Sequence, residues 1–334
     1  GYYAANAGPS GSGVTAVGWG ALYVNSSGSD NTSVGMQSMV ANTTGSSNVA
    51  VGKQALQANT TASDNVAVGY QAAYTGSTAS GVVAIGKSTL YNNTAGYNTA
   101  VGYSVLYANT SGQYNVGIGG YGGGDSTLRY NTTGSYNTAV GMDALRSNTT
   151  TSQNTAIGYQ AAYANATGSQ NTIIGNQAGY NSSGSYFLAI GHQAGYNNTD
   201  SSGNSFVGYQ AGYTNTSGGY NQAFGNAALY TNSTGSYNTA IGRQALYLNT
   251  TASYNTAVGY QAGNSITSGS NTMVGYQAGY NYTLGGNCTF IGFGCTAGAS
   301  GDSHEIVIGT NSPTGKGNNT GFISPNAGDR KSTR

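Results

Sequence analysis

A motif of Ala, then Val or Ile, then Gly recurs along the 334-residue chain, and its period constrains the fold more than any other feature. With the Gly taken as an anchor, eighteen copies lie between Gly18 and Gly309. Thirteen of the seventeen intervals are 17 residues, three are 16 and one is 22. A unit this short cannot bury a core alone, whereas stacked copies can. The period therefore predicts a solenoid.

The residue before the anchor Gly indicates which element each unit contains. It is apolar in all eighteen copies and β-branched in every copy except Phe224. Such residues favour strands. We interpret the following Gln-Ala-Leu-Tyr or Gln-Ala-Gly-Tyr segment as a second short strand, and Asn-Thr-Thr-Gly-Ser as a turn. We therefore predict an all-β fold, a parallel β-solenoid or β-roll of about eighteen 17-residue coils, with Val/Ile ladders in its core and Ala/Gly ladders where sheets approach closely.

The limits of the repeat divide the chain into three parts. Residues 1–13 form a lead-in, 14–310 the solenoid, and 311–334 a polar tail or connector. The chain begins without Met, which indicates a processed or excised piece, and no secretory signal opens it.

The single 22-residue interval places an insertion at 119–129. Insertions in solenoids emerge on one face and often bind partners, although a tolerated bulge is the alternative. Its candidate recognition residues are Tyr121, Asp125 and Arg129.

Charge is scarce, at 5% of residues with a net charge of +1. A charged residue in every coil would stack like charges at about 4.8 Å, which is unfavourable. No basic stripe is available for nucleic acid, and no apolar run is long enough to insert into a membrane. Eight carboxylates and two His leave few groups for acid–base chemistry. We expect no enzyme, no cofactor and no bound metal.

Two side-chain types recur in register. Asn stands four residues before the anchor in thirteen units and is expected to hydrogen-bond along the stack. Tyr recurs five residues after the anchor, where it either stabilises the stack or contacts a ligand, since Tyr rings pack on sugars. The candidate surface row is Tyr163, Tyr180, Tyr196, Tyr213, Tyr230 and Tyr247.

The turn also repeats the N-glycosylation acceptor pattern Asn-x-Ser/Thr, which one consensus motif generates again and again. Glycan attachment and plain turn chemistry are both open for these residues. They are Asn25, Asn42, Asn59, Asn109, Asn131, Asn148, Asn165, Asn181, Asn215, Asn232 and Asn249.

The remaining candidates are isolated. Cys288 and Cys295 are either buried thiols or a disulfide across one coil. His192 stands at a variable surface position. His304 and Glu305 are adjacent, and a hydrophilic turn is favoured there over a metal contact.

The repeat consensus Asn-Thr-Ala-Val-Gly with Asn-Thr-Thr-Gly-Ser-Tyr, of which residues 137–153 and 238–254 are close copies, resembles two families. One is the head repeat of trimeric autotransporter adhesins, and the other is the repeat region of tailed-phage fibres. Residues 318–328 look like the sequence that precedes an intramolecular chaperone in such fibres. The resemblance covers about 90% of the chain and implies a left-handed roll and a homotrimer.

The expected function is that of a non-enzymatic extracellular fibre or adhesin, on a cell or virion surface, that presents Tyr, Asn and Thr to a host surface or glycan receptor. One alternative is a structural filament that assembles end to end. A second is an ice-binding solenoid, against which each unit offers one strand Thr rather than a pair. Examples of this strand Thr are Thr99, Thr138, Thr155, Thr239 and Thr256.

Overall fold

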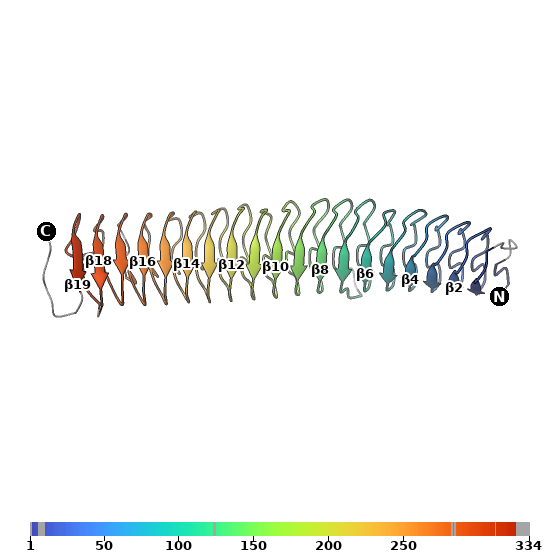
Figure 1. The fold of residues 1–334 in the computed structure, drawn as a ribbon, viewed down its shortest axis with the longest axis horizontal. Coiled ribbons are helices and arrows are strands. Elements are labelled where there is room, and N and C mark those ends of the chain that lie inside the picture. The colour runs from blue at the N-terminus through green and yellow to red at the C-terminus, as the bar shows by residue number, and fades with distance from the viewer. Residues whose placement is uncertain are drawn as a thin grey trace. The chain divides into compact units, whose positions relative to one another are not determined.

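The structure is a computed structural model that describes residues 2–5, 11–122, 125–281, 283, 285–310 and 312–324. It is all-β, and the prediction of a parallel solenoid with about eighteen coils of 17 residues is confirmed. The chain divides into two compact units, Gly1–Gln170 and Asn171–Arg334. Each unit is a stack of short parallel strands, one to a coil, as Figure 1 shows.

The strands are three residues long in every coil but the last two. The first unit contains β1 (Thr15–Val17), β2 (Thr32–Val34), β3 (Val49–Val51), β4 (Val66–Val68), β5 (Val83–Ile85), β6 (Thr99–Val101), β7 (Val116–Ile118), β8 (Thr138–Val140) and β9 (Thr155–Ile157). The second contains β10 (Thr172–Ile174), β11 (Leu188–Ile190), β12 (Ser205–Val207), β13 (Gln222–Phe224), β14 (Thr239–Ile241), β15 (Thr256–Val258), β16 (Thr272–Val274), β17 (Thr289–Ile291), β18 (Ile306–Gly309) and β19 (Gly321–Ser324).

Each strand pairs with equivalent residues of the next coil, so that Ala240 lies beside Ala257 and Ile241 beside Val258. The anchor Gly fixes this close stacking. Gly242 has a φ of +128°, and a Cβ built on it would lie 2.4 Å from the carbonyl oxygen of Gly259. Only glycine fits such a position.

The second strand predicted after the anchor is wrong, because the Gln-Ala-Leu-Tyr segment forms a turn. In one coil Gln244 has a φ of 57° and Leu246 a φ of 50°, both left-handed. These residues still bond to the neighbouring coils, from Gln244 N to Asn226 O at 2.9 Å and from Leu246 N to Ala262 O at 3.0 Å.

The predicted direction of the strand side chains is also wrong. The central strand residue, Ala in about half of the coils, is buried in nearly every coil, and the Val or Ile before the anchor faces outward. Ile85 and Ile241 are 39% and 41% exposed. The coil is so narrow that the strand offers Ala to its interior, while Leu from the turn fills the remaining core, as Leu246 does at 0% exposure.

Volume is balanced within this core. Where the strand carries Phe206, the turn residue six positions on is Gly212 instead of Leu, and a Cβ there would lie 2.5 Å from the Phe206 ring. Ala240 and Leu246 make the opposite pairing two coils later, and both are fully buried. Large and small residues therefore exchange places between strand and turn.

Two columns of buried Asn hold the coils together, as predicted for the column four residues before the anchor. Asn238 N donates to the Asn221 side-chain oxygen at 2.9 Å, and Asn238 Nδ2 donates to Ala252 O at 2.9 Å. In the second column, Asn249 Nδ2 donates to Oδ1 of Asn232 at 3.0 Å. An amide both donates and accepts, so identical Asn side chains satisfy one another from coil to coil.

Both ends of the repeat extend further than the motif indicated. In the lead-in, Ala5 N donates to Ala21 O at 2.9 Å. In the segment assigned to a polar tail, β19 pairs in register with β18. Residues 325–334 of that segment lie outside the described residues.

The volume balance predicts a compensating pair of substitutions. Phe206→Ala alone should lower the free energy of unfolding by about 3–5 kcal/mol, and Gly212→Leu alone should also lower it because Leu would collide with the ring. The double variant should be more stable than either single variant, since it restores the pairing seen at Ala240 and Leu246. Urea denaturation of the four proteins measures this, and additive losses would contradict the shared volume.

Candidate functional site

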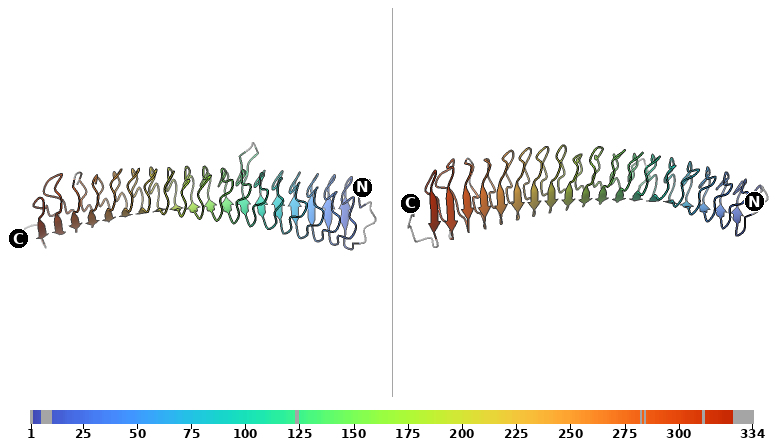
Figure 2. Two further views of the ribbon diagram at one scale, coloured as in Figure 1. Left: turned by 90° about the horizontal axis from the view of Figure 1, so that it is seen from above. Right: turned by 45° about the horizontal axis from the view of Figure 1, so that its top comes forward.

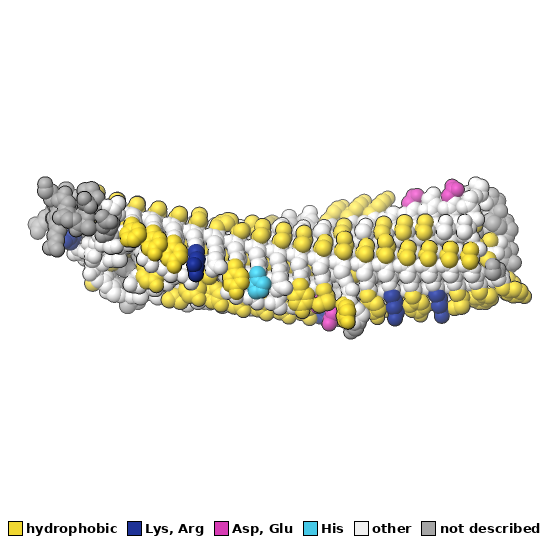
Figure 3. Space-filling model, turned by 90° about the horizontal axis from the view of Figure 1, so that it is seen from below, with side chains coloured by type: hydrophobic (Ala, Val, Ile, Leu, Met, Phe, Trp, Pro, Cys, Tyr) yellow, Lys and Arg dark blue, Asp and Glu magenta, His cyan; other side chains and the backbone are white. Residues whose placement is uncertain are grey.

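The outer face of the strands carries a row of exposed apolar side chains in each unit. The third residue of each strand points outward, and many of these side chains are between 36% and 58% exposed. Figure 3 shows hydrophobic side chains in rows along successive coils. The exposed members are Val17, Val51, Ile85, Ile118 and Ile157 in the first unit and Ile190, Phe224, Ile241, Ile291 and Ile323 in the second. Such a contiguous apolar row is typical of an interaction surface.

The predicted Tyr row is half-buried and stacked. In the second unit Tyr180, Tyr196, Tyr213, Tyr230 and Tyr247 stack in order, with centroids 5.0–5.2 Å apart and planes within 18° of parallel. Each ring therefore covers its neighbour's face and presents an edge and a hydroxyl. Burial, followed by the neighbouring phenols Tyr213 and Tyr247, raises the pKa of Tyr230, so this phenol is uncharged at neutral pH.

A second Tyr row, five residues before the anchor, is more exposed and was not singled out from the sequence. Tyr97, Tyr114 and Tyr136 stack with centroids 5.0–5.2 Å apart, as do Tyr220, Tyr237 and Tyr254 at 5.2 Å. Their exposure runs from 44% to 63%. The period would have revealed this row, because several coils carry Tyr at the same offset.

The insertion after β7 leaves the stack as a loop (Figure 2), closed by an antiparallel bridge between Gly120 and Ser126. Of its predicted recognition residues, Tyr121 is 74% exposed. Asp125 pairs with Arg146 of the next coil at 2.9 Å rather than with Arg129.

Arg129 belongs to the Tyr row rather than to the tip of the loop. Its guanidinium lies 5.2 Å from the Tyr107 ring centroid, and that of Arg146 lies 5.2 Å from Tyr163. Two Arg side chains thus occupy successive Tyr positions, and π contacts stabilise each cation. Nη1 of Arg129 is buried without a hydrogen-bond partner among the described residues.

Asp143 lies beside this pair at 4% exposure. Burial, and then the charge of Asp125, raise the pKa of its carboxyl, while Arg146 and a hydrogen bond with Gln160 act in the opposite direction. Gln occupies this position in most other coils and forms a ladder, as between Gln210 and Gln193 at 2.8 Å.

Ten of the Asn residues in glycosylation patterns are at most 1% exposed. Their amides form the second Asn column, in which Asn232 Nδ2 donates to Asn215 Oδ1 at 2.6 Å and to Gly235 O at 2.9 Å. A glycan on this nitrogen would displace these bonds and would have no room in the folded coil. Asn181 is half-buried and donates to Asn197 at 2.8 Å.

Both cysteines are free and buried, so the disulfide left open by the sequence is absent from this structure. Cys295 Sγ donates to Ile291 O at 3.1 Å, and burial raises the pKa of its thiol. His192 stacks on Tyr209 with centroids 5.3 Å apart. Within the described ranges, no three His, Cys, Asp or Glu residues gather as a metal site requires.

The chain was compared with known proteins, and no family model, curated protein or solved structure matches it. In the part of the chain that the structure describes, no helix is long and apolar enough to cross a membrane.

The environment of Asp143 predicts that replacing this residue stabilises the fold by an amount that depends on pH. Because its folded-state pKa is raised, the folded protein holds the proton more tightly than the unfolded chain, and stability falls as pH rises from the ordinary aspartate pKa of 3.8 through the raised value. Asp143→Gln should therefore raise the free energy of unfolding by about 1 kcal/mol at neutral pH and by less near pH 3.8. Denaturation at both pH values measures this, with Asp64→Asn, at an exposed side chain, as the control. An equal gain at both pH values would contradict the assignment.

Proposed function

We propose that this chain is a non-enzymatic segment of an extracellular or virion-surface fibre, and that its repeated surface attaches to a host surface or its glycans. The observation that carries the proposal is the register of the outward side chains, which repeats a single surface pattern from coil to coil. The resemblance of the repeat to phage fibres and adhesin heads supports the same function.

Repetition suits attachment through many weak contacts. Identical groups spaced by one coil can bind a polymeric target at several points, and the linked contacts add avidity without any single strong site. The stacked Tyr rows supply such groups. Because their faces are covered, the phenol edges and hydroxyls would make the contacts.

Attachment through the half-buried Tyr row can be tested by removing hydroxyls while keeping the rings. Tyr213→Phe, Tyr230→Phe and Tyr247→Phe together should weaken binding to an array of bacterial surface polysaccharides about tenfold, because each hydroxyl contributes about 0.5 kcal/mol. The matched control carries Phe at 220, 237 and 254 in the second row.

If both variants bind as well as the unchanged chain, the Tyr hydroxyls do not make the contacts with the polysaccharide. If only the control variant loses binding, the second Tyr row is the contact surface. A chain that binds none of the polysaccharides would remove the attachment proposal.

We further propose that copies of the chain pack through the outer strand face, as a homotrimer. The exposed Val/Ile row is the supporting observation, because burying it would stabilise an assembly by about 25 cal/mol per Å² of apolar surface. The same row supports the second candidate, a structural filament in which copies associate in an open series.

The outer face predicts the assembly state. Native mass spectrometry of the unchanged protein should give a species of three 33.6 kDa chains. Val68→Thr, Ile85→Thr and Val101→Thr together should shift it to single chains, since Thr keeps the strand but reduces apolar area. The control is Tyr97→Gln, Tyr114→Gln and Tyr136→Gln, because Gln153 and Gln170 hold the same offset. An open series of masses would favour the filament, and single chains throughout would exclude both assemblies.

A further inference from the structure

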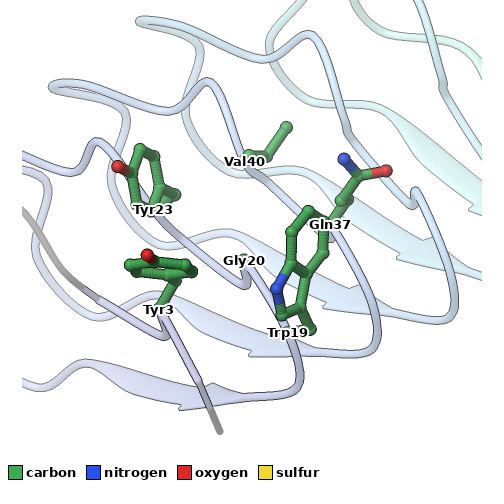
Figure 4. A pocket seen from close by; sticks show the side chains of 6 residues that line it. All are labelled: Tyr3, Trp19, Gly20, Tyr23, Gln37 and Val40. Carbon is green, nitrogen blue, oxygen red and sulfur yellow. The ribbon is translucent and has the colours of Figure 1, made fainter.

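A pocket of about 380 Å³ lies beside β1, in the first unit. Figure 4 shows aromatic side chains around it, with a glycine at its floor. Its lining residues are Tyr3, Trp19, Gly20, Tyr23, Gln37 and Val40.

The pocket exists because one member of the Gln ladder is missing. Gly20 stands two residues after its anchor, where the next three coils carry Gln37, Gln54 and Gln71. These Gln residues have φ values of 56–60°, close to the 67° of Gly20, so the backbone does not require glycine there. A Cβ on Gly20 would meet nothing closer than the Gln37 side chain at 3.7 Å. The absent side chain therefore leaves an open space without relieving any collision.

The same gap leaves a donor without its acceptor. Along the ladder, each Gln amide nitrogen donates to the oxygen of the Gln one coil before, from Gln54 to Gln37 at 3.4 Å and from Gln71 to Gln54 at 3.1 Å. Gln37 would donate to the position of Gly20, which offers no side-chain oxygen. Gln37 is half-buried, it lines the pocket, and its amide nitrogen has no hydrogen-bond partner among the described residues.

The aromatic rings at the pocket are not stacked face to face, unlike those of the two Tyr rows. Tyr3 and Tyr23 meet edge to face, at 90° and 5.9 Å. The next residue in the row of Tyr23 is Val40, which covers no ring face. Trp19, Tyr3 and Tyr23 are 50%, 46% and 37% exposed.

We propose that this pocket binds one neutral sugar ring. The C–H faces of a pyranose pack on aromatic rings such as the half-exposed Trp19, and its hydroxyls can accept a hydrogen bond from the amide nitrogen of Gln37. Among the described residues that line the space, none is charged. A quaternary ammonium group also binds aromatic cages, but it makes no hydrogen bond to an amide. The proposal rests on the proposed attachment function, for which it places one sugar unit of the target.

Trp19 is the only Trp in the chain, so its fluorescence reports on this pocket alone. Titration of the full chain with the methyl glycosides of glucose, galactose, mannose and N-acetylglucosamine, each to roughly 10 mM, should give a saturable change with at least one of them. Gly20→Gln should weaken that binding at least tenfold, because it restores the ladder and fills the space with the consensus residue.

The matched control is Gln71→Gly, which opens the same ladder at a different coil and should keep the response. Circular dichroism and the melting temperature establish that both variants are folded. No response to any glycoside would overturn the proposal. So would a response that persists in Gly20→Gln, or a saturable response to choline alone.

The proposal of a sugar-binding pocket and the proposal of attachment are tested by different measurements. A Trp19 response to a glycoside that Gly20→Gln abolishes supports the pocket even if the chain binds no polysaccharide on the array. Binding to the array without any Trp19 response supports attachment and overturns the pocket.

Discussion

The buried asparagine amide is the interaction on which the rest of this structure depends. A parallel stack in register places every side chain beside its equivalent in the next coil. A buried polar residue that repeats must therefore be able to hydrogen-bond to another copy of itself. Asn meets this condition because its amide can donate in one direction and accept in the other, as Asn232 does when it donates to Asn215 and accepts from Asn249. Two such columns satisfy the buried turns, and the thin Ala and Leu core can then suffice.

The same condition explains where charge is found. A cation repeated at the strand spacing would repel its neighbour, and most coils carry none. Arg129 and Arg146 are the exception, on successive coils of the Tyr row. Their charges are tolerated because Tyr107 and Tyr163 lie against the outer faces of the pair and because Asp125 reaches Arg146 from the insertion. The insertion thus supplies the carboxylate that forms an ion pair with Arg146.

Much of this fold could be predicted from the sequence, because the period, the strand position and the Asn column all follow from residues that repeat. The direction of the strand side chains could not, since alternation in Thr-Ala-Val is compatible with either face inside. The coil is narrow, and for that reason the strand face that carries Ala points inward. The turn at Gln244 and Leu246 was missed because non-glycine residues seldom adopt left-handed φ values, and here the stack enforces them. The pocket could have been found at Gly20 only by comparing coils position by position.

The exchange of volume between strand and turn has a consequence for the length of the molecule. In coils such as that of Ala240 and Leu246, the large and small partners belong to the same coil, and the backbone bonds made above and below are alike. Such a coil balances the volumes of its own strand and turn, although Leu246 also lies close to Gly263 of the next coil. Duplicating or deleting it would lengthen or shorten the stack by one step and leave the joint on either side unchanged. The number of coils can therefore change by duplication or deletion within the gene, without further substitutions in the interior.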